Sequence, residues 1–394
     1  MKILLLYDYP PPPAGLATQG DLLYRGLKEI GVDALATHFE SSLEKEWYYR
    51  WFKPDVVVGV GYWGHLPQIV LHPQQFGLLA VPWLVADGFI ANYQDVLNDL
   101  PLILVTSNWV KDVYMRDGIR GDQIEVLPVG IDTDLLVPYP KDDPNVIAIR
   151  EVFGILPDQQ MVLTVGGDGA SKGAPEVMQA LASLMQTNSH HLKIGTDLLE
   201  AQPAWKYIVK VWPQPRTVKQ NHLDLELAKR LGIAKQVVYS MDRTSRDFMP
   251  YLYSACDVYA APSRLEGFGM PQLEAGACEK PVIGIAAMGM LDTLVHGETA
   301  LLAGVAVENT IRETVLGHDA GFKQGHRVVF ATPRIADYRA DTGDLAQHFE
   351  ALFHDPDLRR RLGEAGRKRV VENYNYRIVA RRFVEILSQR LGIV

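Results

Sequence analysis

Short apolar runs alternate with amphipathic stretches along almost the whole chain, and this alternation restricts the fold more than any other feature. The apolar runs predict strands at 1–7, 55–60, 81–86, 102–107, 124–130, 161–167, 236–241, 257–263 and 281–287. The intervening periodicity predicts helices at 21–31, 174–185, 246–255, 271–278 and 376–391. Strands that alternate with helices are typical of a parallel sheet covered on both faces.

A Pro- and Asp-rich stretch at 137–145 interrupts this pattern, which then restarts. A chain of 394 residues is too long for one ordinary core, so we expect two α/β domains. The boundaries predicted are 1–140 for the first domain and 141–375 for the second. The last helix, within 376–394, is expected to pack back on the first domain. Residues 305–343 are less regular and are predicted to be a loop excursion.

Composition narrows the class of protein. Hydrophobic residues make up 47% of the chain and charged residues 22%, as in soluble globular proteins. No apolar stretch reaches the roughly 18–20 residues of a membrane helix, and the N-terminus lacks a full signal sequence. The two cysteines, Cys256 and Cys278, make no disulfide framework. A cytoplasmic protein is therefore expected.

The net charge of −8 lies entirely in the first part of the chain. Residues 1–150 hold 11 Lys and Arg against 19 Asp and Glu, whereas residues 151–394 hold 28 of each. An acidic first domain disfavours nucleic acid and anionic lipid as partners. We therefore expect no nucleic-acid partner and no membrane association; the oligomeric state is not readable.

The segment 262–284, PSRLEGFGMPQLEAGACEKPVIG, carries the most chemical information. A buried strand runs into a glycine loop, and Pro271 then opens a helix, where proline is favoured. Gly267 and Gly269 allow the backbone to approach a ligand closely. The first N–H groups of the helix lack internal partners and carry the positive end of its dipole. The segment therefore predicts an anion site suited to a diphosphate.

Two carboxylates, Glu266 and Glu274, bracket this loop. A carboxylate accepts hydrogen bonds from hydroxyl groups, so a sugar and a ribose are the expected partners. The alternative is that Glu274 only complements the helix dipole and that Glu266 is an exposed loop charge.

The segment resembles the family-4 retaining glycosyltransferases, which have the GT-B fold of two Rossmann-like doubly wound domains facing a central cleft. The resemblance implies that Glu266 contacts the donor sugar and Glu274 holds the ribose. It also implies that Gly267 and the amides of Phe268, Gly269 and Met270 bind the distal phosphate.

The stretch 162–181 resembles the family's strand, loop and helix that carry an Arg and, five residues later, a Lys before Gly. Lys172 matches the Lys and is expected to stabilise the leaving diphosphate. Gly167 stands where the family has Arg. Arg243 and Arg264 are candidates to supply the absent charge, and surface charges are the alternative for both.

Three further positions enter by resemblance. Gly15 matches a glycine near the donor diphosphate, with a flexible turn as the alternative. Asp87 stands where the family often has a His that contacts the sugar, with turn chemistry as the alternative. Met241 and Arg243 follow a strand near which the donor base is expected.

No metal site is expected. Asp132 and Asp134 spell an Asp-x-Asp pattern but are interpreted as capping and turn residues. His190, His191 and His222 lack metal-ligand spacing.

The sequence thus predicts a retaining, metal-independent hexosyltransferase without a cofactor. It would use a nucleotide-sugar, UDP- or GDP-linked, and an unidentified hydroxyl acceptor. Lys172, Glu266 and Asp87 are the expected catalytic residues. A GT-B sugar phosphorylase, and a nucleotide-sugar-binding protein with reduced or lost turnover, remain open. The loop GGDGASKG fits neither a Walker loop nor a dinucleotide fingerprint, which argues against a dehydrogenase.

Overall fold

The computed structural model describes residues 1–86, 88–188 and 204–393, which divide into two compact units. The first unit comprises Met1–Asp132, Asn309–Ala336 and Glu372–Val394, and the second comprises Thr133–Glu308 and Asp337–Val371. The chain therefore passes between the units at four places. The sequence analysis placed two boundaries, after residues 140 and 375.

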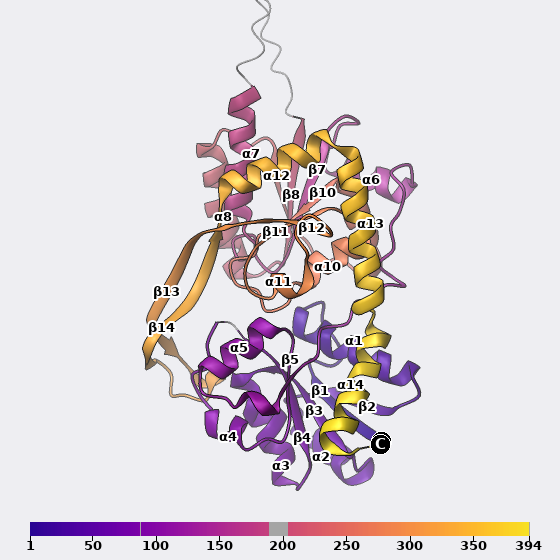
Figure 1. Ribbon diagram of the computed structural model, residues 1–394, viewed down its shortest axis with the longest axis vertical. Coiled ribbons are helices and arrows are strands. Elements are labelled where there is room, and N and C mark those ends of the chain that lie inside the picture. The colour runs from indigo at the N-terminus through magenta and orange to yellow at the C-terminus, as the bar shows by residue number, and fades with distance from the viewer. Residues whose placement is uncertain (87, 189–203, 394) are drawn as a thin grey trace, which may run out of the picture. The chain divides into compact units, whose positions relative to one another are not determined.

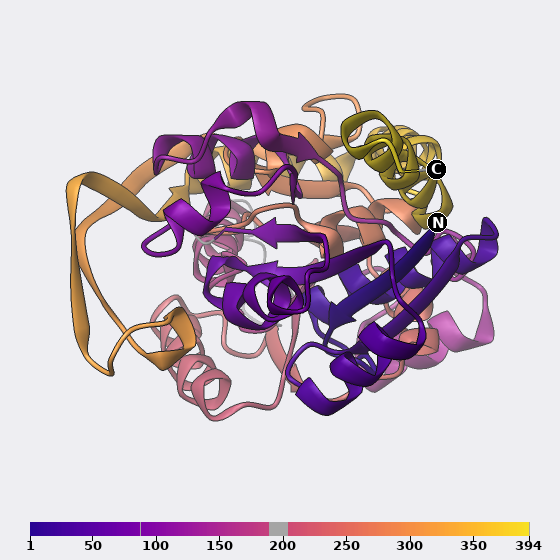
Figure 2. The same cartoon turned by 90° about the horizontal axis from the view of Figure 1, so that it is seen from below.

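The first unit is built on a six-stranded parallel sheet of order β2-β1-β3-β4-β5-β6. The strands are β1 (Lys2–Tyr7), β2 (Asp33–His38), β3 (Val56–Tyr62), β4 (Ala80–Val85), β5 (Ile103–Val105) and β6 (Ile124–Val126). Its helices include α1 (Gly15–Glu29), α2 (Ser42–Trp51), α3 (His72–Gln75), α4 (Gln94–Asn98), α5 (Asn108–Arg116) and α14 (Tyr376–Leu391). In Figure 2 the indigo and purple strands of this sheet have helices around them. Helices on both faces explain why the strands are almost continuously apolar.

Helix α14 packs on α1 within this unit. Gly26 on α1 is so close to Ala380 that a Cβ at Gly26 would lie 2.8 Å from the Ala380 Cβ. The Tyr376 hydroxyl also donates a hydrogen bond of 2.8 Å to Glu29. The end of the chain thus completes the first unit, although it follows the second in sequence.

The second unit repeats the architecture with a parallel sheet of order β12-β11-β10-β7-β8-β9. The strands are β7 (Gln160–Val165), β8 (Trp205–Val211), β9 (Val237–Met241), β10 (Val258–Ala260), β11 (Val282–Ile285) and β12 (Ala300–Ala303). The helices are α6 (Pro144–Val152), α7 (Ala174–Asn188), α8 (Pro215–Arg230), α9 (Met249–Ala255), α10 (Met270–Ala277), α11 (Met290–Thr293), α12 (Thr342–His354) and α13 (Pro356–Asn373) (Figure 1).

The strand order of the second sheet reverses between β7 and β10. The chain moves outward from β7 through β8 to β9, and then returns to place β10 on the other side of β7. Ligands of doubly wound sheets bind at the carboxyl ends of the strands at such a reversal. A ligand site is therefore expected at the loops that follow β7 and β10.

Residues 305–343, predicted to be a loop excursion, instead form a two-stranded ribbon. Strands β13 (Val305–Leu316) and β14 (His326–Ala340) run side by side (Figures 1 and 2). The tip of the ribbon belongs to the first unit. There the Arg334 guanidinium lies 2.8 Å from the buried carboxylate of Asp117, and Phe330 packs on Phe89. The prediction was wrong because the strands are mostly solvent-exposed and therefore lack an apolar period.

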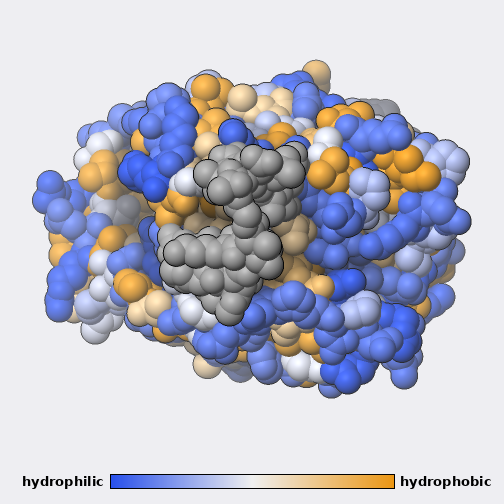
Figure 3. Space-filling view, turned by 90° about the horizontal axis from the view of Figure 1, so that it is seen from above, coloured by the Kyte–Doolittle hydropathy of each residue, from blue (hydrophilic) through white to orange (hydrophobic). Residues whose placement is uncertain are grey.

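The predicted fold class of two Rossmann-like domains is confirmed. The prediction missed β2, β8 and β12, and it matched α14 at both ends. On the face seen in Figure 3, hydrophobic residues are interspersed with hydrophilic ones. Among the described residues, no helix combines the length and apolar character needed to span a membrane.

Candidate active site

The loops that follow β7 and β10 lie against each other. A Cβ on Gly173 would lie 2.4 Å from the carbonyl oxygen of Pro262, and φ at Gly173 is +80°. The Arg264 N–H donates to the carbonyl of Ser171 across the same junction, at 2.9 Å. Only glycine fits this contact, so Gly173 brings the Lys-bearing loop onto the loop that carries Glu266.

Lys172 and Glu266 form an ion pair at this junction. Each side chain is 16% exposed, so the pair is shielded from water but not sealed. Gly166 makes room for the lysine stem, because a Cβ there would lie 2.5 Å from the Lys172 Cγ. Two residues that the sequence analysis assigned to one site are thus brought into direct contact from positions 94 apart in the chain.

The N-terminus of α10 supplies the third element. Gly269 is its N-cap, with φ +89°, and a Cβ at Gly269 would lie 2.1 Å from the Met290 methyl group. The Gly269 N–H donates to the second carboxylate oxygen of Glu266 at 3.2 Å. Glu266 therefore accepts from an ammonium and from a helix N-terminal amide. A phosphate would use these same two donors.

Phe268 does not present its ring to solvent. The side chain is 4% exposed, and its carbonyl accepts a hydrogen bond of 3.3 Å from the Thr293 hydroxyl. Phe268 thus anchors the loop, which leaves backbone amides as its means of contacting a ligand. Gly267 contacts Gly289 so closely that a Cβ at Gly289 would meet the Gly267 carbonyl at 2.1 Å.

Glu274 lies one turn into α10 and accepts a 2.7 Å hydrogen bond from the buried Tyr253 hydroxyl. Withdrawal from water raises the pKa of Glu274, while the Tyr253 hydrogen bond and the charges of Arg246 and Lys210 oppose that rise. One oxygen is held by Tyr253, so the carboxylate is oriented before any ligand arrives.

Arg264, a candidate for the charge absent at Gly167, is paired with a carboxylate in the structure and stays a prediction. Its guanidinium makes a two-pronged ion pair with Glu176, at 2.8 Å for the shortest contact, and Arg339 adds a second cation at 3.3 Å. Burial raises the pKa of Glu176, and Arg264 opposes that rise. Arg243 and Met241 are exposed at the end of β9. They stay predictions for the donor base.

The remaining predicted residues lie in the first unit, in the loop after β7 or outside the described part. Gly15 is the first residue of α1 in the first unit. Gly167 follows β7, and no atom lies within 4 Å of where its Cβ would stand. Asp87 lies outside the described residues, as do His190 and His191. Asp132 is buried in an ion pair with Arg25 at 2.8 Å. Within the described ranges, no three His, Cys, Asp or Glu side chains are grouped as metal ligands would be.

Sequence reasoning missed Lys210 and Tyr253. Lys210 lies near the end of β8 and is 4% exposed. Alternation in the sequence WKYIVKV could have predicted this strand and placed Lys210 on it, because Trp205, Tyr207 and Val209 share one face. Nothing in the sequence pattern marked Tyr253 as a site residue except its place in a helix that precedes the segment with Glu266 and Glu274.

The geometry described so far is that of an anion-binding loop and helix at the reversal of a doubly wound sheet. Residues 145–315, which contain all of it, match the family Glycosyl transferases group 1. This segment is therefore similar to the glycosyl transferases group 1.

Curated relatives extend the comparison to a larger part of the chain. The chain is 29% identical to a D-inositol 3-phosphate glycosyltransferase from Stackebrandtia nassauensis over 263 residues, which are 66% of this chain and 52% of the relative. It is 30% identical to another protein of that name from Salinispora tropica, over 59% of this chain and 41% of the relative. The chain thus spans about half the length of the curated relatives it matches.

Solved structures share the fold along the whole chain. Anabaena HepE in complex with UDP and glucose superposes with a TM-score of 0.71 at 16% identity, covering 99% of this chain and 100% of HepE. The sucrose-phosphate synthase of Thermosynechococcus elongatus gives 0.73 at 17% identity and covers 100% of both chains. The predicted GT-B fold is thereby confirmed.

Proposed function

We propose that this chain is a retaining, metal-independent glycosyltransferase that moves a hexose from a UDP- or GDP-linked donor to a hydroxyl acceptor. The observation that carries the proposal is the contact of Lys172 and the Gly269 amide with one carboxylate, that of Glu266. A cation and a helix N-terminus that converge on an anion at a strand-order reversal suit the diphosphate of a nucleotide-sugar.

Each residue of the site is proposed to bind a different part of the nucleotide-sugar. Lys172 and the amides of Gly269 and Met270 take the diphosphate and stabilise the negative charge that grows on it as it leaves. Glu266 must release these donors when the diphosphate binds, and it then accepts hydrogen bonds from the sugar hydroxyls. Glu274, already oriented by Tyr253, accepts from the ribose hydroxyls.

The reaction exchanges one C–O bond for another. The bond between the sugar C1 and the diphosphate oxygen breaks, and the acceptor oxygen forms its bond to C1 on the same face. The acceptor proton passes to the departing phosphate oxygen. Because the acceptor attacks on the face that the diphosphate leaves, the configuration at C1 is retained. Asp87 is proposed to contact the sugar.

The comparisons support the donor class. HepE was determined with UDP and glucose, and a Mycolicibacterium smegmatis relative, 25% identical over 74% of this chain, is named a GDP-mannose-dependent mannosyltransferase. We expect one of UDP, GDP, ADP and TDP to raise the melting temperature, equally with magnesium and with EDTA. Glu274→Ala should abolish the shift, and NMR of the product should show a retained anomer. A chain that responds to none of the nucleotides would not be a nucleotide-sugar transferase.

A further inference from the structure

Lys210 lies at the carboxyl end of β8, beside the loop that bears Lys172. Its carbonyl accepts the Gly166 N–H at 3.1 Å, and the Trp212 N–H donates to the Gly167 carbonyl at 3.3 Å. The segment from Lys210 to Trp212 is therefore tied to the two glycines that open the loop after β7. Lys210 is thus a neighbour of the candidate site through the backbone of the sheet.

The side chain of Lys210 is 4% exposed, and among the described residues its ammonium has no ion-pair partner. It lies 4.7 Å from the centroid of the Trp212 ring, and among the described residues its Nζ makes neither a hydrogen bond nor an ion pair. Burial lowers the pKa of Lys210, while the charges of Asp242 and Glu274 work in the opposite direction. A charge on a largely buried side chain is ordinarily paired, so the unpaired ammonium of Lys210 is available to an anionic partner that enters the adjoining cavity.

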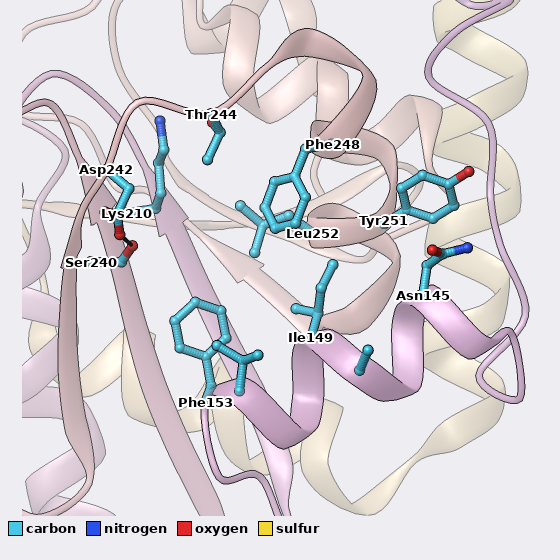
Figure 4. A pocket seen from close by; sticks show the side chains of 12 residues that line it. Asn145, Ile149, Phe153, Lys210, Ser240, Asp242, Thr244, Phe248, Tyr251 and Leu252 are labelled. Atoms are coloured by element: carbon cyan, nitrogen blue, oxygen red, sulfur yellow. Dashed lines mark hydrogen bonds between the residues drawn. The ribbon is translucent and has the colours of Figure 1, made fainter.

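The ammonium lines a cavity of about 430 Å³ at the ends of β8 and β9. In Figure 4 the side chain of Lys210 extends past its strand toward the loop of Thr244, with Asp242 on the other side. The opposite wall is mostly apolar and comes from α6 and α9, including Ile149 and Leu252. A cavity with one cation on a polar rim suits a ligand that has an anionic group and a flat apolar part.

We propose that Lys210 is a second cation of the donor site, which binds a phosphate oxygen of the nucleotide while Glu274 holds the ribose. This inference rests on the proposed function. It also explains how the site can bind a diphosphate with Gly167 at the position where the family has Arg. The second positive charge would come from Lys210 on the neighbouring strand. The space next to Gly167 is open, since no atom lies within 4 Å of its Cβ position, so an arginine side chain can be tried there.

The experiment measures nucleotide affinity by calorimetry for wild type, Lys210→Met and Lys206→Met. Lys206 is the matched control, because it stands on the same face of β8 at the other end of the strand. With the nucleoside diphosphate that the wild type binds, Lys210→Met should bind about 10- to 100-fold more weakly, which is the effect of one charged hydrogen bond. Lys206→Met should bind as the wild type does. Circular dichroism establishes that both variants are folded.

Two further arms locate the contact. Binding of the nucleoside alone, followed by ligand-observed NMR, should be the same in wild type and Lys210→Met, because the nucleoside has no phosphate. Gly167→Arg added to Lys210→Met should recover about tenfold of the lost affinity.

The outcomes separate the two proposals. A wild type that binds no nucleotide contradicts the proposed function itself. A wild type that binds, with Lys210→Met binding equally well, overturns the role of Lys210 and leaves the function standing. An equal loss of nucleoside binding would also overturn it, since Lys210 would then contact the base.

Discussion

Among the described residues, each unit contains one lysine with a buried side chain, and the two lysines have different partners. In the first unit, the Lys45 ammonium donates to the carbonyl oxygens of Phe39 and Gln68, at 2.7 and 3.1 Å. In the second unit, the Lys210 ammonium lies over the Trp212 ring and, among the described residues, makes no hydrogen bond or ion pair. Lys45 is 1% exposed and Lys210 is 4% exposed, so burial alone does not distinguish them.

The difference separates a lysine that supports the fold from one kept for a ligand. Lys45 spans from α2 to two other segments and satisfies carbonyls that would otherwise lack a donor. Lys210 satisfies no carbonyl, and it lies at the carboxyl end of its strand, where ligands of such sheets bind. An unsatisfied buried charge costs stability, and its retention is expected where activity requires it.

The largest effect is expected for a third lysine, Lys172, which is paired with a carboxylate and lies in the proposed transition-state site. Lys172→Met should reduce turnover of the nucleotide-sugar by about 10²- to 10³-fold, as does the loss of one preorganised charge-stabilising donor. Steady-state kinetics of donor hydrolysis or transfer would measure it, with the exposed Lys219→Met as the control. Unchanged kcat would remove Lys172 from the chemistry.

Removal of the first unit's lysine should affect stability and not binding. Lys45→Met leaves the carbonyls of Phe39 and Gln68 without their donor, so we expect unfolding to become easier by about 2 kcal/mol. Native-state hydrogen exchange of the amides of residues 42–51 would localise the loss. The exposed Lys28→Met should change nothing. If Lys45→Met were as stable as wild type, the contrast between the two lysines would fail.

Lys45 also predicts how stability depends on pH. Burial lowers its pKa from 10.5 to about 8, so between these values the unfolded state binds more protons than the folded state. Stability should therefore rise with pH across this window, by at most about 1.4 kcal/mol per pH unit from this group. Urea unfolding at pH 8 and 10 would measure the rise, and the part due to Lys45 should vanish in Lys45→Met. An identical slope in the variant would assign the pH dependence to other groups.

The contrast also shows what the sequence could and could not predict. The glycine loop, Pro271 and the two glutamates form one continuous pattern, so the anion-binding helix was readable from local chemistry. The contact of Lys172 with Glu266 depends on β10 returning beside β7, and strand order is not written in any local pattern. The ion pair of Arg264 could not be predicted for the same reason, because its partner Glu176 is 88 residues away.

Lys210 was not predicted as a site residue because β8 itself was not predicted. Its two lysines, Lys206 and Lys210, make the strand less apolar than its neighbours. Periodicity predicts a face as buried when it is apolar, and it has no means of recognising a cation buried for a ligand. Asp87 lies outside the described residues, so its role stays a prediction.

The smallest expected effect is that of Lys210→Met on the stability of the free protein. It is the most specific test of the difference between Lys45 and Lys210. Lys210→Met removes a buried ammonium that lacks an ionic partner and replaces it with an apolar side chain of similar length. The ligand-free protein should therefore become slightly more stable, by about 0.5–1 kcal/mol, while its nucleotide affinity falls. Differential scanning calorimetry without and with nucleotide would show the opposite signs: a higher melting temperature for the free variant, and a smaller rise on adding nucleotide. Lys45→Met should give a lower melting temperature and an unchanged nucleotide-induced rise. If both variants lowered the melting temperature of the free protein, Lys210 would be a structural lysine like Lys45, with the Trp212 ring serving as its partner.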